Sequence, residues 1–213
     1  MLYDIYIFGL FFIILVLLYS VYFIRFSPNK IKIIGTVAVA ILLIRYICAL
    51  VMLLTHSMVY LYALKIPYFV DFLGISILIF ILFYVFIRRN YINFNYVFLF
   101  SIIAAVIYII QMYKSDVVVR GMDNFGYTML LKGSMPTYWI YIIFITVMLF
   151  LSIIFSRKPN VNSKGLYMLV FSAAVTIVEN IGLVIDKGFF PANIFGDLLF
   201  IITFIYALSK LRK

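Results

Sequence analysis

The stretch that decides the fold is Tyr3–Ile24, which reads YDIYIFGLFFIILVLLYSVYFI and has Asp4 as its one charged residue. About 20 helical residues, each rising about 1.5 Å, cross the roughly 30 Å of hydrocarbon in a bilayer. The stretch carries no basic residue ahead of its apolar run, and no cleavage site of small residues follows it. It therefore predicts a membrane-spanning helix that we expect to remain in the mature protein.

Six further apolar runs of similar length follow along the chain. They are Ile33–Leu54, Tyr68–Ile87, Tyr96–Met112, Tyr138–Phe155, Leu166–Ile185 and Ala192–Leu208. Hydrophobic residues make up 68% of the chain and charged residues 11%, with a mean hydropathy of +1.23. A soluble domain is about half apolar and a quarter charged. We predict an all-α fold: one polytopic transmembrane bundle of about seven helices over residues 1–213, in the plasma membrane.

Lysine and arginine in alternate loops predict the orientation, because loops that stay in the cytoplasm are richer in them. One set of loops and termini holds Arg25, Lys30, Lys32, Arg88, Arg89, Arg157, Lys158, Lys164, Lys210, Arg212 and Lys213. The alternate set holds Lys65, Lys114, Arg120, Lys132 and Lys187. The N-terminus is thus predicted outside and the C-terminus inside. Since the basic residues serve as topology signals, the net charge of +10 does not indicate a nucleic-acid partner.

Two charged residues lie deep inside predicted spans. Arg45 is twelve residues beyond Ile33, and Glu179 is thirteen residues beyond Leu166, in helices that both run from inside to outside. At 1.5 Å per residue both lie about 18–20 Å above the inner boundary. A charge at this depth is costly, and is usually paired and often functional. We therefore expect Arg45 and Glu179 to face one another or to share a polar cavity.

Other polar residues belong to the same outer half of the membrane. Ser172, Thr176 and Asn180 form a helical stripe with Glu179, and Asn193, Gly196 and Asp197 share a face of the last span. The predicted binding residues, or buried pairing residues, are Arg45, Asp71, Gln111, Glu179, Asn180 and Asp197. The functional interpretation is an outward-facing polar pocket for a small ligand or ion. The alternative is that a buried ion pair fixes helix register, with Asp71 and Asp197 at the interface.

The sequence lacks the residue patterns of several kinds of catalytic, metal and phosphate-binding site. The chain has one histidine, His56, and one cysteine, Cys48, and it lacks HExxH, CxxC and a phosphate-binding glycine loop. We therefore expect no enzyme activity, no metal and no cofactor. All five prolines fall in predicted loops or at helix entrances, so the broken helices of many transporters are not expected. The longest loop, Tyr113–Thr137, is predicted outside, as a lid over the outer mouth, an interfacial segment or a simple connector.

The end of the chain carries a family resemblance. Glu179-Asn180-Ile181, a short outer turn, Pro191-Ala192-Asn193-Ile194, Asp197 and a basic exit from the membrane follow one another within Val170–Lys213. This region resembles the seven-helix N-terminal membrane sensor region of some bacterial histidine kinases and diguanylate cyclases. The resemblance implies a sensor region, and no kinase or cyclase module follows Lys213 in this sequence. The resemblance therefore implies either a separate output partner in the cytoplasm or membrane, or that this sequence is a fragment of a longer protein.

Three functions remain open at this point. The first is a sensory or regulatory membrane protein that binds a small ligand from outside and shifts its helix packing. The second is a small secondary transporter or exporter that uses Arg45 and Glu179 as its coupling pair. The third is a membrane assembly or immunity subunit whose polar residues specify packing. The sequence does not indicate an oligomeric state or a partner beyond the lipid bilayer.

Overall fold

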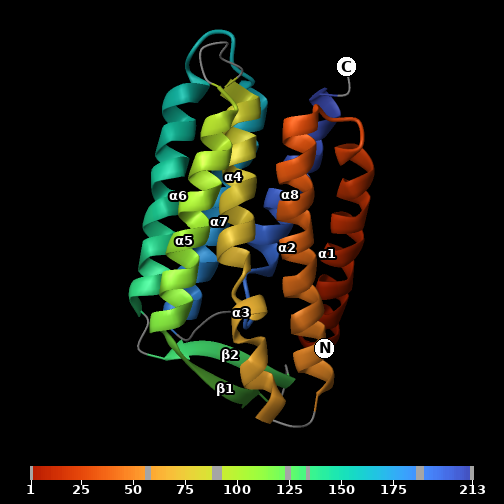
Figure 1. Cartoon of the computed structure of the whole chain (residues 1–213), viewed down its shortest axis with the longest axis vertical. Helices are drawn as coiled ribbons and strands as arrows, with labels where there is room; N and C mark the ends of the chain where they lie inside the picture. Colours follow the sequence, from red (N-terminus) through yellow and green to blue (C-terminus); the bar gives the residue numbers. More distant parts are fainter. Residues whose placement is uncertain are drawn as a thin grey trace.

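The computed structural model describes residues 2–55, 59–87, 93–122, 126–132, 135–185 and 190–211. It is a bundle of long helices with a small β-hairpin across one end (Figure 1). The helices are α1 Leu2–Ile24, α2 Asn29–Leu54, η1 Val59–Leu64 (a 3-10 helix), α3 Lys65–Tyr68, α4 Asp71–Ile87, α5 Asn95–Lys114, α6 Met135–Ser156, α7 Ser163–Val184 and α8 Ile194–Leu211. The strands are β1 Asp116–Met122 and β2 Gly126–Lys132.

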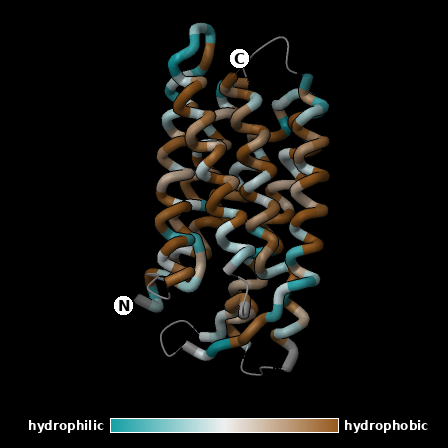
Figure 2. The backbone as a smooth tube through the Cα atoms, turned by 90° about the vertical axis from the view of Figure 1, so that its left-hand side faces the viewer, coloured by the Kyte–Doolittle hydropathy of each residue, from teal (hydrophilic) through white to brown (hydrophobic). Residues whose placement is uncertain are grey.

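Within the described residues, seven helical segments are long and apolar enough to cross a membrane. Each of them overlaps one of the seven predicted spans, which confirms the helical bundle. Brown and pale segments alternate along the helices in Figure 2, and the most hydrophilic residues gather toward the ends of the bundle. An apolar exterior of this kind is stable where lipid replaces water around the helices.

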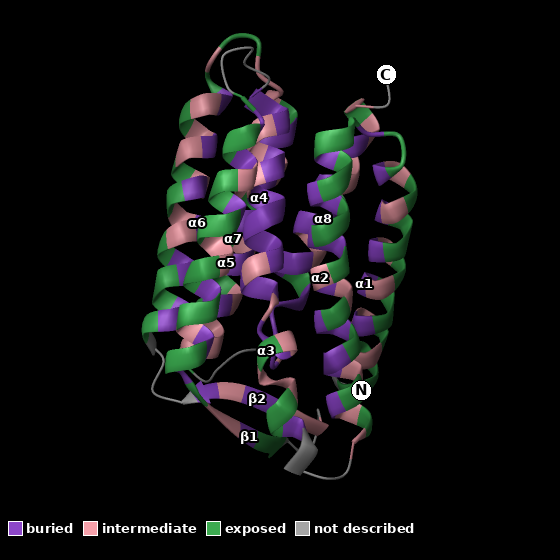
Figure 3. Ribbon diagram, in the orientation of Figure 1, coloured by how far each residue is buried: buried purple, intermediate pink, exposed green. Residues whose placement is uncertain are grey.

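Helix α4 is the centre of the bundle. It packs against α2, α5, α6, α7 and α8. In the most apolar 18 residues of its span, 78% of the residues are buried. Figure 3 shows these buried residues along α4. Gly74 lets α2 approach closely, because a Cβ there would lie 2.7 Å from a methyl carbon of Leu42. Small residues allow such close contacts in membranes, where helices associate through packing. Helix α5, in contrast, has its main helix contact with α4 and faces outward along most of its length.

The third span differs from its prediction. Its apolar helical run begins at Leu61, and Pro67 lies inside it rather than at its entrance. The run consists of η1, α3 and α4, with a break at Phe69 and Val70 ahead of α4. Proline removes a backbone donor and clashes with the preceding turn. Pro67 therefore lies within the apolar run and ahead of its long helix, α4.

The long loop after α5 folds into a two-stranded antiparallel hairpin, which no helical pattern predicted. Val119 pairs with Met129 and Val117 with Leu131, so these four side chains share one face of the ribbon. Val119, Met129 and Leu131 are buried in the core. The hairpin lies across the end of the bundle that carries the N-terminus (Figure 1). Because the ribbon packs on α2 and η1, this part of the loop is more than a plain tether.

Candidate functional site

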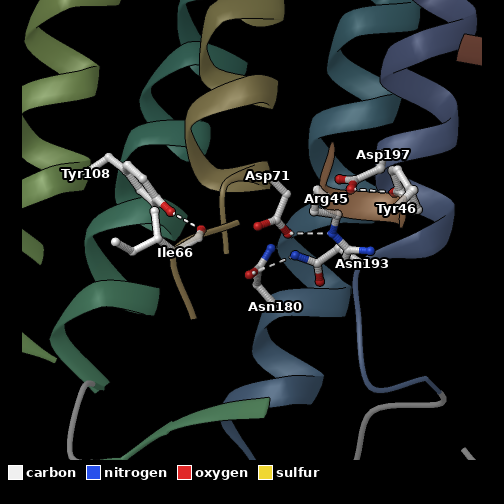
Figure 4. A network of polar contacts seen from close by, with 8 residues as sticks. All are labelled: Arg45, Tyr46, Ile66, Asp71, Tyr108, Asn180, Asn193 and Asp197. Atoms are coloured by element: carbon white, nitrogen blue, oxygen red, sulfur yellow. Dashed lines mark hydrogen bonds and ion pairs between the residues drawn. The ribbon is translucent and has the colours of Figure 1, made fainter. Parts of the chain in front are cut away.

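Arg45 is the one buried cation among the described residues of the bundle. Its side chain is 2% exposed, and its Nε lies 3.7 Å from Oδ2 of Asp71. The guanidinium carbon also lies 4.5 Å from the centre of the Tyr46 ring and 5.7 Å from that of Tyr68. An ion pair and two aromatic faces together reduce the cost of holding a cation in an apolar bundle. Figure 4 shows the arginine between Asp71 and Asp197.

The pairing of Arg45 with Asp71 corrects the expected pairing with Glu179. Glu179 accepts hydrogen bonds from the backbone N–H groups of Phe195 at 3.0 Å and Gly196 at 2.7 Å. Its carboxylate therefore caps the start of α8, where free N–H groups and the helix dipole favour negative charge. The two residues share a polar region without forming the predicted pair.

Asp197 brings a second buried carboxylate to Arg45. It is 1% exposed, and its Oδ2 accepts a 2.7 Å hydrogen bond from the Tyr46 hydroxyl. Asp71 and Asp197 both lie in the first turn of their helices, α4 and α8. The positive end of a helix dipole stabilises a carboxylate in this position. Two helix starts and one arginine thus hold two carboxylates within one cluster.

The predicted polar stripe of α7 is buried and completes the cluster. Asn180 is fully buried, and its amide donates to the carbonyl of Thr176 at 2.8 Å. The amide of Asn193 donates to Oδ1 of Asn180 at 3.1 Å, which joins α7 to the segment ahead of α8 (Figure 4). About two turns from Asn180 along α7, the hydroxyls of Ser172 and Thr203 lie 3.1 Å apart. The polar face of α7 is therefore matched by polar groups on α8.

Gln111 lies outside this cluster. It is half-buried near the end of α5 and lines an apolar groove bounded by α4, α5 and α6. The structure thus brings together Arg45, Asp71, Glu179, Asn180 and Asp197 and leaves Gln111 in the groove. Of the other residues considered from sequence, His56 lies outside the described residues.

Sequence reasoning missed the tyrosines of the cluster. Tyr46 and Tyr68 are buried against Arg45, although aromatic residues of membrane proteins concentrate at the interface. Tyr46 follows Arg45 directly in the middle of a span, and that adjacency is the one signal the sequence offered. The position of Tyr68 beside Arg45 depends on the helix break at Phe69 and Val70, which the amino-acid composition did not indicate.

The Tyr108 hydroxyl attaches α5 to the break. It donates to the carbonyl of Ile66, next to Pro67 in α3 (Figure 4). Inside a membrane an unsatisfied carbonyl costs several kcal/mol, so broken helices persist where a side chain supplies the missing donor. Tyr108 therefore stabilises the segment that places Asp71 opposite Arg45.

Several buried polar atoms of the cluster have no hydrogen-bond partner in the part of the chain that the structure describes. They are Nε and Nη1 of Arg45, Oδ1 of Asp71, Oδ1 of Asn193 and Oδ1 of Asp197. Buried polar groups are almost always hydrogen-bonded, because an unsatisfied one costs about 1–3 kcal/mol and a charged one more. Both donors and acceptors thus remain for water, an ion or a small polar molecule. The described residues contain no group of three His, Cys, Asp or Glu able to hold a metal ion.

Comparison with known proteins adds no assignment to this geometry. No family model matches the chain, and no curated protein matches it in a sequence search.

Proposed function

We propose that this multi-pass membrane protein is sensory or regulatory and binds a small polar ligand or ion at the cluster of Arg45, Asp71 and Asp197. The observation that carries the proposal is the set of buried polar atoms without hydrogen-bond partners, among the described residues, where α2, α4, α7 and α8 meet. A cluster that served packing alone would be expected to satisfy its own donors and acceptors.

The ligand enters from outside in this proposal. The described basic residues at the end that carries the C-terminus are Arg25, Lys30, Lys32, Arg157, Lys158, Lys164 and Lys210. Those at the hairpin end are Lys65, Lys114, Arg120 and Lys132. The larger basic set favours the cytoplasm at the C-terminal end. The cluster lies toward the hairpin end, and the hairpin then acts as an external cover.

Sensing fits the way in which the cluster connects helices. Arg45 belongs to α2, Asp71 to α4 and Asp197 to α8, which runs on to the cytoplasmic end. A ligand that competes for Arg45 or for either carboxylate changes how α8 packs against α2 and α4. Such a ligand shifts the bundle only if it binds two packings with different affinity. The moving end of α8 and the short inner loops are the surface for an output partner.

Secondary transport is the second candidate, and the break in the third span favours it. Many transporters bind substrate beside interrupted helices near the middle of the membrane. Here α3 ends at Tyr68 and α4 begins at Asp71, so the interruption lies directly beside a charged residue of the cluster. The coupling pair in this candidate is Arg45 with Asp71, in place of the Arg45 and Glu179 pair expected from sequence.

Neutralising Asp71 and neutralising Asp197 should lower the stability of the bundle by different amounts. Asp71→Asn removes the charge that pairs with Arg45, and breaking a buried ion pair costs about 3–5 kcal/mol. Asp197→Asn keeps an amide oxygen for the Tyr46 hydroxyl, so its cost is about 1 kcal/mol, that of one weakened hydrogen bond. Unfolding in detergent measures both. Equal losses would contradict the assignment of Asp71 as the main partner of Arg45.

A double-mutant cycle with ligand probes tests the proposal. The purified full chain is compared with Arg45→Gln, Asp71→Asn and the double variant, with exposed Arg25→Gln as the matched control. Thermal unfolding is followed with sodium, ammonium, glycine and phosphate as probes. We expect at least one probe to raise the unfolding temperature of wild type and of the Arg25 control, and to have no effect on the cluster variants.

The same cycle separates the other functions. A double variant that regains wild-type stability, combined with no response of wild type to any probe, would refute ligand binding and favour a structural subunit. Flux of the active probe into proteoliposomes that contain wild-type protein distinguishes transport from sensing. A sensor binds the probe without moving it across the membrane.

A further inference from the structure

A groove lies on the outer surface of the bundle, away from the charged cluster. It has a volume of about 670 Å³ and is bounded by α4, α5 and α6. It exists because α5 rests on α4, and α6 packs mainly on α7. Its walls are almost wholly apolar and rich in aromatic rings, among them Phe80, Phe83, Phe100 and Phe144. Phe80 of α4 stacks on Phe100 of α5, with ring centres 5.5 Å apart.

The groove follows most of the thickness of the membrane. Along α5 it extends from Tyr96 to Gln111, which at 1.5 Å per residue is about 22 Å. Dividing 670 Å³ by this length gives a mean cross-section of about 30 Å². A packed helix about 10 Å across requires about 80 Å². A single hydrocarbon chain, whose width is set by carbon contacts of 3.5–4.0 Å, requires about 15–20 Å². The mean cross-section is closer to that of a lipid chain than to that of a helix.

Charge at one end of the groove indicates the kind of lipid. Ile87 and Tyr96 line the end that lies toward the basic, C-terminal side of the bundle. Next to Tyr96, the exposed Lys30 donates a 3.0 Å hydrogen bond to Oδ1 of Asn95. Lysine at the polar boundary of a membrane attracts anionic headgroups by about 1 kcal/mol each. The opposite end is closed by Phe72, Tyr108 and Gln111.

We propose that the groove binds one acyl chain of an anionic phospholipid whose headgroup lies beside Lys30. The lipid occupies the gap between α5 and α6 and supports α5, which has little other helix contact. At its far end the chain meets Phe72 and Tyr141, whose ring centres lie 4.7 Å apart. Phe72 follows Asp71 directly, so the lipid also supports the wall behind the charged cluster. The proposal does not depend on a ligand at that cluster.

Photolabelling tests the site. The full chain is placed in nanodiscs that contain phosphatidylglycerol or phosphatidylcholine with a diazirine on the acyl chain, and labelled peptides are mapped. We expect phosphatidylglycerol to label the groove faces of α4, α5 and α6 more strongly than the exposed face of α1. Ala104→Trp fills the groove and should lower this labelling about tenfold, which corresponds to about 1.4 kcal/mol of binding free energy. The neighbouring Ala105 does not line the groove, so Ala105→Trp is the matched control.

Two further measurements identify the preferred headgroup, and neither of them requires the Ala104→Trp variant. Unlabelled phosphatidylglycerol should displace the label from wild-type protein better than unlabelled phosphatidylcholine, and Lys30→Gln should abolish that preference. Equal labelling of α1 and the groove would show an ordinary lipid annulus and overturn the proposal. Equal competition by the two lipids in wild type would overturn the anionic headgroup.

Discussion

The contact between α7 and α8 depends on Gly196. A Cβ at this position would lie 2.2 Å from the Thr176 hydroxyl, 2.8 Å from a carboxylate oxygen of Glu179 and 2.9 Å from the backbone of Thr176. The last of these contacts cannot be relieved by a side-chain rotation. Gly196→Ala must therefore push α8 away from α7. Overpacking costs about 1–3 kcal/mol, and the hydrogen bond from the Gly196 N–H to the charged Glu179 is worth about 1.5–3 kcal/mol.

We expect Gly196→Ala to lose about 3–5 kcal/mol of stability in unfolding experiments on the detergent-purified chain. Gly9→Ala is the control, because its Cβ would lie 3.4 Å from Ile194, an ordinary contact, and helical alanine gains about 0.5–1 kcal/mol over glycine. Adding Thr176→Ala removes the hydroxyl and should restore part of the loss in Gly196→Ala. Equal stability of the two alanine variants would refute the close approach of α8 to α7.

Two smaller perturbations test the end of the bundle that covers the cluster. Tyr108→Phe removes the donor to the carbonyl beside the break and should cost about 1–2 kcal/mol in the same unfolding assay, whereas Tyr113→Phe, at a site 91% exposed, should cost nothing. A loss no larger at Tyr108 than at Tyr113 would contradict its role at the break. Gly126 has φ +67°, and a Cβ at this position would lie 3.3 Å from the Leu53 backbone. Both features oppose a side chain, so Gly126→Ala should speed amide exchange in the hairpin relative to the control Gly121→Ala. Identical exchange in both variants would show that the hairpin does not depend on this contact.

The sequence was sufficient to predict the seven spans because their signal is local. A run of about 20 apolar residues has one stable form in lipid, since its backbone groups must bond within the segment. The β-hairpin left no such signal. Its strands of seven residues alternate only weakly, and Val118 and Thr128 interrupt a simple inward and outward pattern. The hairpin is stabilised by contacts with α2 and η1, which are distant in sequence.

The partner of Arg45 was not predictable by the same reasoning. Counting residues along a helix gives depth, and depth matched Arg45 with Glu179. Which helix lies beside α2 at that depth depends on packing, and α4 is its neighbour. The break after Tyr68 then starts α4 at Asp71, where the carboxylate faces the arginine. Depth follows from composition and helix rise, whereas the direction in which a residue faces follows from the whole bundle.

Three carboxylates lie in the cluster with a single arginine, and each of them has a second source of stabilisation. Glu179 accepts hydrogen bonds from two N–H groups at the start of α8, which stabilise its charge without a contact to Arg45. Asp71 and Asp197 each take part of their stabilisation from their own helix starts, so Arg45 does not have to balance both alone. In the proposed ligand-binding function, the buried carboxylate oxygens without hydrogen-bond partners would favour ligands that bring donors or positive charge. A ligand that brought only acceptors would have to displace Asp71 from Arg45, so we expect sodium or ammonium, rather than phosphate, to raise the unfolding temperature of the wild-type protein.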